Sequence, residues 1–227
     1  MNSIEAMNKR RQANHVIWSY AIAAGTISAI TAVDPEPLSG TALMIFADTP
    51  LVTAVTFSMI VHLALVYNQK NLLADGMIVI ASLSAGLVLG ALGAKILGRI
   101  VPVLGTINNA IISFSLHYAT GHAIIDFFEE ERKITDLTLD YVTKNKAKYE
   151  KEGKKKGKEA IELSKKMSPL DKKELKRLTK EYQAAAKNMK NATEKNDVDQ
   201  SIRLSEELLR IGEKISQIYA KYGYSID

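Results

Sequence analysis

The chain has 227 residues, contains no cysteine and carries a formal net charge of +5. The absence of cysteine excludes a disulfide framework and a thiolate metal site. The mean hydropathy of −0.04 is that of an ordinary soluble protein, but it averages two unlike parts. Residues 1–128 carry 6 Lys+Arg and 6 Asp+Glu, whereas residues 129–227 carry 24 Lys+Arg and 19 Asp+Glu. The first part therefore has the composition of a membrane-associated segment, and the second part that of a solvated one.

Four long runs in the first part lack any Asp, Glu, Lys or Arg, and they cover residues 12–33, 49–69, 76–94 and 100–125. A helix needs about 20 apolar residues to cross the roughly 30 Å hydrocarbon core of a bilayer. The chain has only 5 Pro and no stretch in which apolar and polar residues alternate as in a strand, so we expect an all-α fold. The runs predict about four helices, arranged as an apolar membrane bundle or as membrane-inserted hairpins.

The first run follows the cationic residues 9–11 and stops at the charged, proline-containing residues 34–37. It is too long for the apolar region of a signal peptide, and a second run follows it closely, so we expect a retained anchor. Small residues recur every fourth position in this run, at Ala21, Gly25 and Ala29. Because residues four apart share a helix face, they predict close packing against another helix.

The second run is preceded by Asp48, which is well placed to cap a helix over residues 51–67. This helix is at the short end for a membrane span. It fits a span, a re-entrant or interfacial helix, or a core helix that is buried by its neighbours.

The third run carries a longer row of small residues, at Ser82, Gly86, Gly90, Ala94 and Gly98. Each interior glycine costs a helix in water roughly 1 kcal/mol relative to Ala. Close packing between helices in lipid offsets this cost more easily. The row therefore favours a membrane helix-packing face, with a tightly packed soluble helical core as the alternative.

The fourth run is the most polar, and with Asp48 it supplies the predicted polar interior positions, Asn108, Asn109, His117 and His122. Polar groups in lipid must find partners, so this helix is expected to face other helices. His117 and His122 are five residues apart, which turns them about 140° from each other on a helix. They do not form a ready chelate, and we expect no metal and no cofactor.

Parts of this region resemble a known family. Residues 96–110 (ILGRIVPVLGTINNA), 117–123 (HYATGHA) and 126–128 (DFF) are similar to a bacterial membrane-associated domain of unknown function that is often found beside Era-like or dynamin-like GTPase domains. Residues 46–50 (FADTP), with Met59, Ile60 and Tyr67, resemble the first helical hairpin of that family. The resemblance covers residues 13–131. It departs at His117, where a Thr is expected.

The resemblance implies coupling to a GTPase, but the sequence contains no phosphate-binding motif G-x-x-x-x-G-K-[ST]. Any such GTPase would therefore be a separate chain.

Residues 144–158 contain 8 Lys and 2 Glu, and the lysines are Lys144, Lys146, Lys148, Lys151, Lys154, Lys155, Lys156 and Lys158. Lysines just after an apolar region are attracted to anionic lipid headgroups, at about 1 kcal/mol each. A solvated linker is the alternative. The block contains no Arg, which usually supplies base contacts, so we expect no specific nucleic-acid binding.

Residues 168–223 predict an antiparallel helical hairpin. Ser168 and Pro169 form a strong helix start, and residues 191–197 are expected to form the turn. Apolar residues recur at helical spacing in both helices. The resulting stripe should pack on a third helix, on a copy of itself or on a partner.

We therefore predict an apolar membrane-associated helical domain (residues 1–132), a Lys-rich linker or helix (133–167) and a soluble amphipathic hairpin (168–227). Basic residues at both ends favour the inner membrane with cytosolic N- and C-termini. The leading hypothesis is a non-enzymatic, membrane-anchored protein whose hairpin recruits or regulates a partner, such as a GTPase in trans or itself. The alternatives are a small channel or transporter lined by the polar fourth helix, and a soluble all-α interaction protein. No catalytic motif is present, so an enzyme is not expected.

Overall fold

The computed structural model describes residues 3–33, 49–97, 105–195 and 197–224. Within these ranges the chain is helical and contains no strand, which confirms the predicted all-α class. The helices are α1 (Ser3–Val33), α2 (Thr49–Val66), α3 (Leu73–Leu97), α4 (Gly105–Glu129), α5 (Leu139–Lys166), α6 (Pro169–Glu194) and α7 (Val198–Ala220). Two short 3-10 turns, η1 (Lys70–Leu72) and η3 (Ile134–Asp136), precede α3 and α5.

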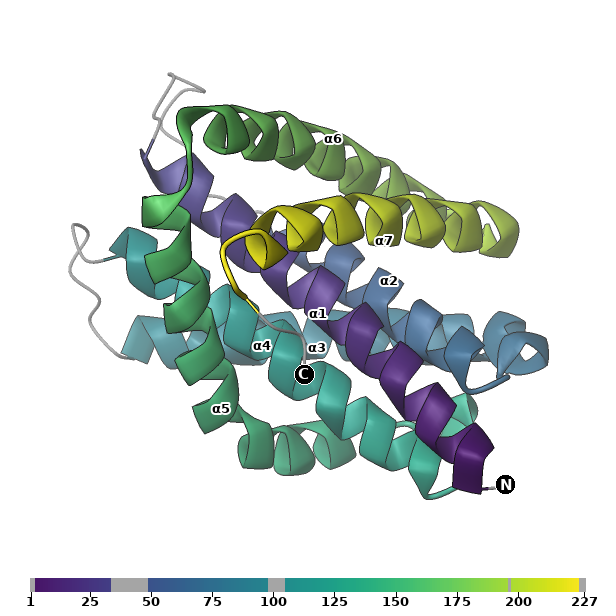
Figure 1. The fold of residues 1–227 in the computed structure, drawn as a ribbon. Helices are drawn as coiled ribbons and strands as arrows, with labels where there is room; N and C mark the ends of the chain where they lie inside the picture. The colour runs from purple at the N-terminus through teal and green to yellow at the C-terminus, as the bar shows by residue number, and fades with distance from the viewer. Residues whose placement is uncertain (1–2, 34–48, 98–104, 196, 225–227) are drawn as a thin grey trace.

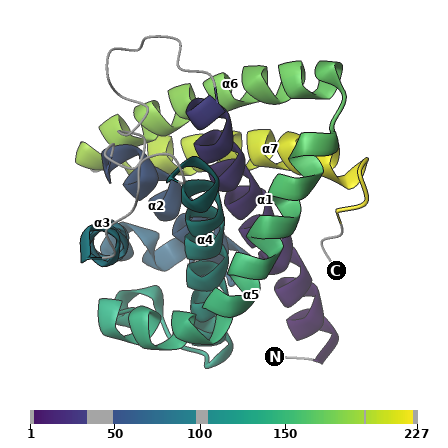
Figure 2. The same cartoon turned by 90° about the vertical axis from the view of Figure 1, so that its left-hand side faces the viewer.

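The helices form one bundle around α1 and α4, which pack along each other through its middle (Figure 1). α5 covers another side of α4, and the antiparallel pair α6–α7 lies across α1 and α2. α3 packs mainly on α2 and lies at one edge of the bundle (Figure 2). The apolar helices α1, α2 and α4 are thus covered by the charged helices, whereas α3 is covered on one side.

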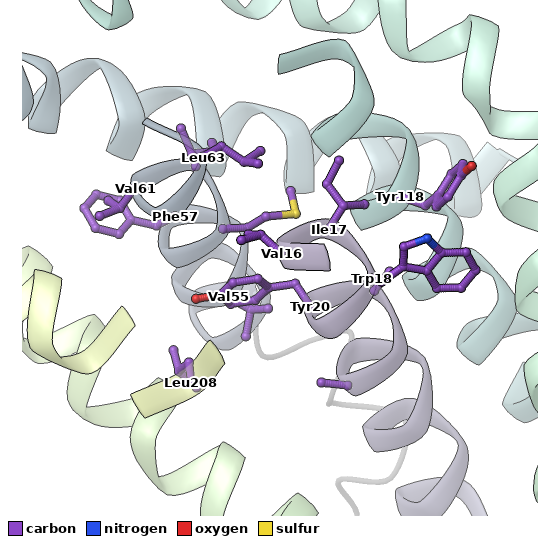
Figure 3. Packing of buried hydrophobic residues seen from close by; sticks show 14 of the residues in the cluster. Val16, Ile17, Trp18, Tyr20, Val55, Phe57, Val61, Leu63, Tyr118 and Leu208 are labelled. Atoms are coloured by element: carbon purple, nitrogen blue, oxygen red, sulfur yellow. The ribbon is translucent and has the colours of Figure 1, made fainter. Parts of the chain in front are cut away.

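A single hydrophobic cluster contains buried residues from all seven α-helices. Tyr20 of α1 lies beside Val55 of α2 and close to Leu208 of α7 (Figure 3), and its hydroxyl donates a hydrogen bond to the backbone oxygen of Ser205 at 3.0 Å. The apolar stripe of the predicted hairpin is therefore covered by α1 and α2 of the same chain. The core continues across the boundaries that the sequence places at residues 132 and 167.

Glycines allow the charged helices to approach the apolar ones closely. A Cβ placed at Gly153 of α5 would lie 3.1 Å from the Cα of Ser115 in α4, and Gly157 faces Phe114 one turn away. A Cβ at Gly212 of α7 would lie 2.7 Å from the backbone oxygen of Ser19 in α1. These glycines serve close helix packing, as was expected of those in the apolar runs, but they stand in polar sequence.

The starts of the last helices follow ordinary capping rules. Ser168 Oγ accepts a hydrogen bond from the backbone N–H of Asp171 at 3.1 Å, which confirms it as the N-cap of α6. The turn expected over residues 191–197 is wrong in its first part, because α6 continues to Glu194 with Ala192 buried in the core. Asp197 caps α7 by accepting a hydrogen bond from the N–H of Gln200 at 3.0 Å.

Two apolar segments differ in burial. The stretch Val52–Val66 of α2 is too short for the usual span and is enclosed almost throughout. Residues Lys70–Val88, in η1 and α3, form the one described stretch that is long and apolar enough to cross a membrane, and fewer than half of them are buried. Length and composition alone do not distinguish a membrane helix from the core helix of a soluble protein. The neighbours of α3 in the bundle are therefore the better guide to its role.

Candidate functional site

The outer face of α5 carries a row of five exposed lysines, Lys144, Lys148, Lys151, Lys155 and Lys158, which we call the lysine ridge. Their spacing of three or four residues places them on one face of the helix. At 1.5 Å per residue the row is about 21 Å long. The opposite face holds Gly153 and Gly157 against α4, so the close α4–α5 contact turns the row outward.

Three of the five acidic residues of α5 pair with lysines outside the ridge. Glu150 lies 3.7 Å from Lys146, and Glu152 lies 3.9 Å from Lys156, each pair being four residues apart. Glu162 lies 2.6 Å from Lys165. Within the described part of the chain, no ridge lysine has an ion-pair partner. The ridge therefore presents positive charge that the fold itself does not use.

The structure sorts the eight predicted membrane-surface lysines into two groups. Six are exposed, namely the ridge and the adjacent Lys154. Lys146 and Lys156 are partly buried and form the ion pairs with Glu150 and Glu152. Lys156 Nζ also lies 4.7 Å from the ring centroid of Trp18, at an open cleft of about 440 Å³. Lys156 therefore joins α5 to α1, whereas the ion pair of Lys146 lies within α5 itself.

The outer face of α3 carries the exposed Asp75 at its first turn and is otherwise uncharged, with Ala74, Ile78, Ala81, Ser82 and Ala85. The side chain of Ile78 is 71% exposed, more than any other large apolar side chain in the described parts of α1 to α5. No charged residue occurs between Gly76 and Val88. Leu139, the first residue of α5, lies against Gly86 and is itself 42% exposed. The apolar surface of α3 therefore continues onto α5, five residues before the ridge begins.

The predicted small-residue faces have different surroundings. Ala21 is fully buried in α1, and a Cβ at Gly25 would lie 3.2 Å from the Cβ of Phe114 in α4. Ala29 packs near Ala110 and Ile161. The small-residue face of α1 therefore packs against α4.

In α3, by contrast, Ser82 is exposed, and a Cβ at Gly86 would meet the side chain of Leu139 rather than the backbone of a neighbouring helix. The surroundings of Gly90 and Ala94, and all of Gly98, lie outside what the structure describes.

Of the predicted polar interior, the structure places the two histidines. His117 is buried between α2 and α4, where its Nδ1 lies 2.9 Å from the carbonyl oxygen of Ser113 and its Nε2 lies 3.4 Å from Thr56 Oγ1. The cavity beside it has a volume of about 20 Å³, enough for one water molecule. Asp48 and the side chains of Asn108 and Asn109 lie outside the described residues.

His122 faces α5, away from His117, as the spacing of five predicts. Its ring lies 4.4 Å from that of Tyr118 and 4.9 Å from that of Tyr149, measured between centroids. Its Nε2 is buried and has no hydrogen-bond partner among the described atoms. Burial lowers the pKa of His122, His117 and also His62 to about 4. All three are therefore neutral at pH 7.

The acidic residues at the end of α4 are held by tyrosines from neighbouring segments. Tyr149 Oη lies 2.9 and 2.8 Å from the two carboxylate oxygens of Asp126. Tyr67 Oη donates to Glu129 at 3.3 Å, and Arg10 pairs with the same carboxylate at 2.9 Å. These acidic residues join α4 to α1, to α5 and to the turn after α2. They serve packing, since their oxygens are already engaged.

In the described ranges, no group of three His, Asp or Glu side chains converges as a metal site. No family model, curated protein or solved structure matches the chain. The resemblance of residues 13–131 to the GTPase-associated domain therefore stays a prediction. The lysine ridge and the outer face of α3 are two described surfaces that the fold itself does not use.

Proposed function

We propose that this chain is a non-enzymatic, membrane-associated helical protein that binds anionic lipid through the lysine ridge. The single observation that carries the proposal is the absence of ion-pair partners for the ridge in the described chain, although Glu150, Glu152 and Glu162 stand on the same helix. Packing against α4 fixes the five lysines on one outward face, so little further ordering is needed to meet a charged surface.

The free energy of attraction between the ridge and an anionic membrane can be estimated from electrostatics. A lysine near an anionic membrane surface contributes about 1 kcal/mol, and the attraction decays within a Debye length of about 10 Å at 0.1 M salt. Five such lysines are sufficient for reversible membrane binding. The 10 Lys against 5 Asp+Glu of residues 139–166 give the whole helix a formal charge of +5, so neighbouring acidic groups reduce the attraction without abolishing it.

Sedimentation with lipid vesicles tests the proposal. The wild-type chain should bind vesicles that contain phosphatidylglycerol and should not bind pure phosphatidylcholine vesicles. Changing all five ridge lysines to Gln should lower the partition coefficient by at least about 100-fold. A matched control changes five exposed lysines of α6 and its C-terminal end to Gln, namely Lys172, Lys173, Lys180, Lys187 and Lys195.

The control removes the same charge from another surface, so it should retain most of the binding. Equal losses in the two variants would show that net charge and not the ridge is responsible. If the wild-type chain did not bind anionic vesicles, the proposal itself would be contradicted.

We propose that the α6–α7 hairpin recruits a partner protein through its outer, polar face. The apolar stripes of α6 and α7 contact α1 and α2, so they are not free for another protein. The outer face of α6 carries Arg177, which pairs with Glu174 and Glu181. A GTPase in trans, or a second copy, would therefore be recognised by charge. The channel hypothesis rests on α4, whose described polar side chains are enclosed in this arrangement.

A further inference from the structure

We infer that the outer face of α3, together with Leu139, inserts into the apolar boundary of the same bilayer that the lysine ridge binds. The inference rests on the proposed function, because it concerns a second contact with the same lipid surface. Its occupant is the lipid acyl region, and the ridge and α3 would act on different layers of one membrane.

The composition of the exposed face supports a lipid occupant. The described outer faces of α5, α6 and α7 are rich in charged side chains, whereas the described outer positions of α3 from Ile78 onward are Ala, Ile and Ser. An amphipathic surface helix normally places its polar side outward in water. In α3 the side that contacts α2 and the side that faces outward are both apolar. Such a helix is suited to an apolar environment on its second side.

Continuity with the ridge supports the bilayer over an unrelated partner. Leu139 contacts Gly86 on α3 and begins the helix that carries Lys144. An apolar strip followed within two helical turns by lysines is the arrangement of interfacial segments, whose apolar side enters the headgroup and acyl boundary while the cations meet the phosphates. Asp75 at the first turn of α3 marks the end of the strip.

The absence of cysteine in the sequence allows a direct test. The variant Ile78→Cys, labelled with an environment-sensitive nitrobenzoxadiazole dye, reports on this face alone. On binding to phosphatidylglycerol vesicles, the emission of the dye should shift to the blue and be quenched by lipids that carry a spin label on the acyl chain. The matched control is Leu170→Cys, because Leu170 is 79% exposed at the start of α6.

Salt then separates the two contacts. At about 1 M salt the Debye length falls to roughly 3 Å, so the attraction of the ridge is largely screened. Wild-type protein that has bound should keep a salt-resistant fraction. Ile78→Ser removes apolar surface without adding charge, and it should lower the salt-resistant partition roughly tenfold. Leu170→Ser should leave it unchanged.

The outcomes distinguish the two hypotheses. Binding to anionic vesicles with an unshifted dye at position 78 would overturn the insertion of α3 and leave the ridge proposal intact. A blue shift that appears without vesicles and rises with protein concentration would show that a second copy covers this face, which also overturns the inference. Absence of any binding by the wild-type chain would contradict the ridge proposal and, with it, the inference.

Discussion

α2 and α3 are both apolar around most of their circumference, but the bundle uses them in different ways. α2 contacts α1, α3, α4, α6 and α7, and nearly all of its described side chains are buried. α3 contacts mainly α2, with smaller contacts to η1, η3, α5 and α7, and leaves Ile78 exposed. The difference shows that apolarity alone does not decide which helix becomes core. The extent of the packing that the topology supplies on each side decides it.

The largest expected difference is in folding stability, when a lysine is introduced into α2 or into α3. Leu63→Lys in α2 places an unpaired ammonium at a position with 0% exposure and should cost more than about 4 kcal/mol, enough to prevent folding of many domains. Ile78→Lys in α3 should change the free energy of unfolding by less than about 0.5 kcal/mol. Urea unfolding followed by circular dichroism measures both. Similar losses at the two positions would contradict the edge position of α3.

Acid should destabilise the enclosed helices. The pKa of His62, His117 and His122 is lowered to about 4 because burial disfavours the charged imidazolium. Between pH 6.5 and 4 the unfolded chain therefore binds more protons at these histidines than the folded one, so stability falls as the pH falls through this window, and the contribution of the histidines is complete near pH 4. Each histidine contributes on the order of 3 kcal/mol to the loss.

Urea unfolding at a series of pH values checks this expectation. His117→Gln should remove about a third of the slope, since one of three comparable groups no longer titrates. A free energy of unfolding that stays constant from pH 6.5 to 4 would show that the imidazoles are hydrated or paired in solution. The described part of α3 contains no histidine, so the acid effect belongs to α2 and α4.

A smaller contrast separates two glycines. Ala in place of Gly raises helix propensity by about 1 kcal/mol. At Gly212 the added Cβ would meet the backbone oxygen of Ser19 at 2.7 Å, which cannot move without shifting α1. Gly212→Ala should therefore be about 1 kcal/mol less stable than wild type, because overpacking costs roughly 1–3 kcal/mol.

Gly86→Ala provides the matched comparison. Its Cβ would meet the end of the Leu139 side chain, which is partly exposed and free to rotate. This variant should be up to about 1 kcal/mol more stable than wild type. Thermal unfolding of the pair measures the difference. If Gly212→Ala were the more stable of the two, α7 would not approach α1 as closely as the structure has it.

Much of the local structure could be predicted from the sequence. The all-α class and the N-cap at Ser168 depend on neighbours within a few residues, and they are confirmed. The continuation of α6 past residue 191 could not be predicted in this way, because Asn is typical of turns and the burial of Ala192 depends on the core. The separation of the ridge from Lys146 and Lys156 could not be predicted from spacing, because Lys148, Lys155 and Lys158 also have a Glu four residues away.

The sequence by itself determined the helical class, the cap at Ser168 and the division between apolar and charged parts, because these follow from short-range preferences and composition. Only the tertiary structure decided that the charged helices cover α1, α2 and α4 and that α3 is left at the edge. A helix that is apolar on every side carries no stripe that specifies its orientation. Close contacts such as Gly212 with Ser19 join residues far apart in the chain, and they exist only once the whole bundle has packed.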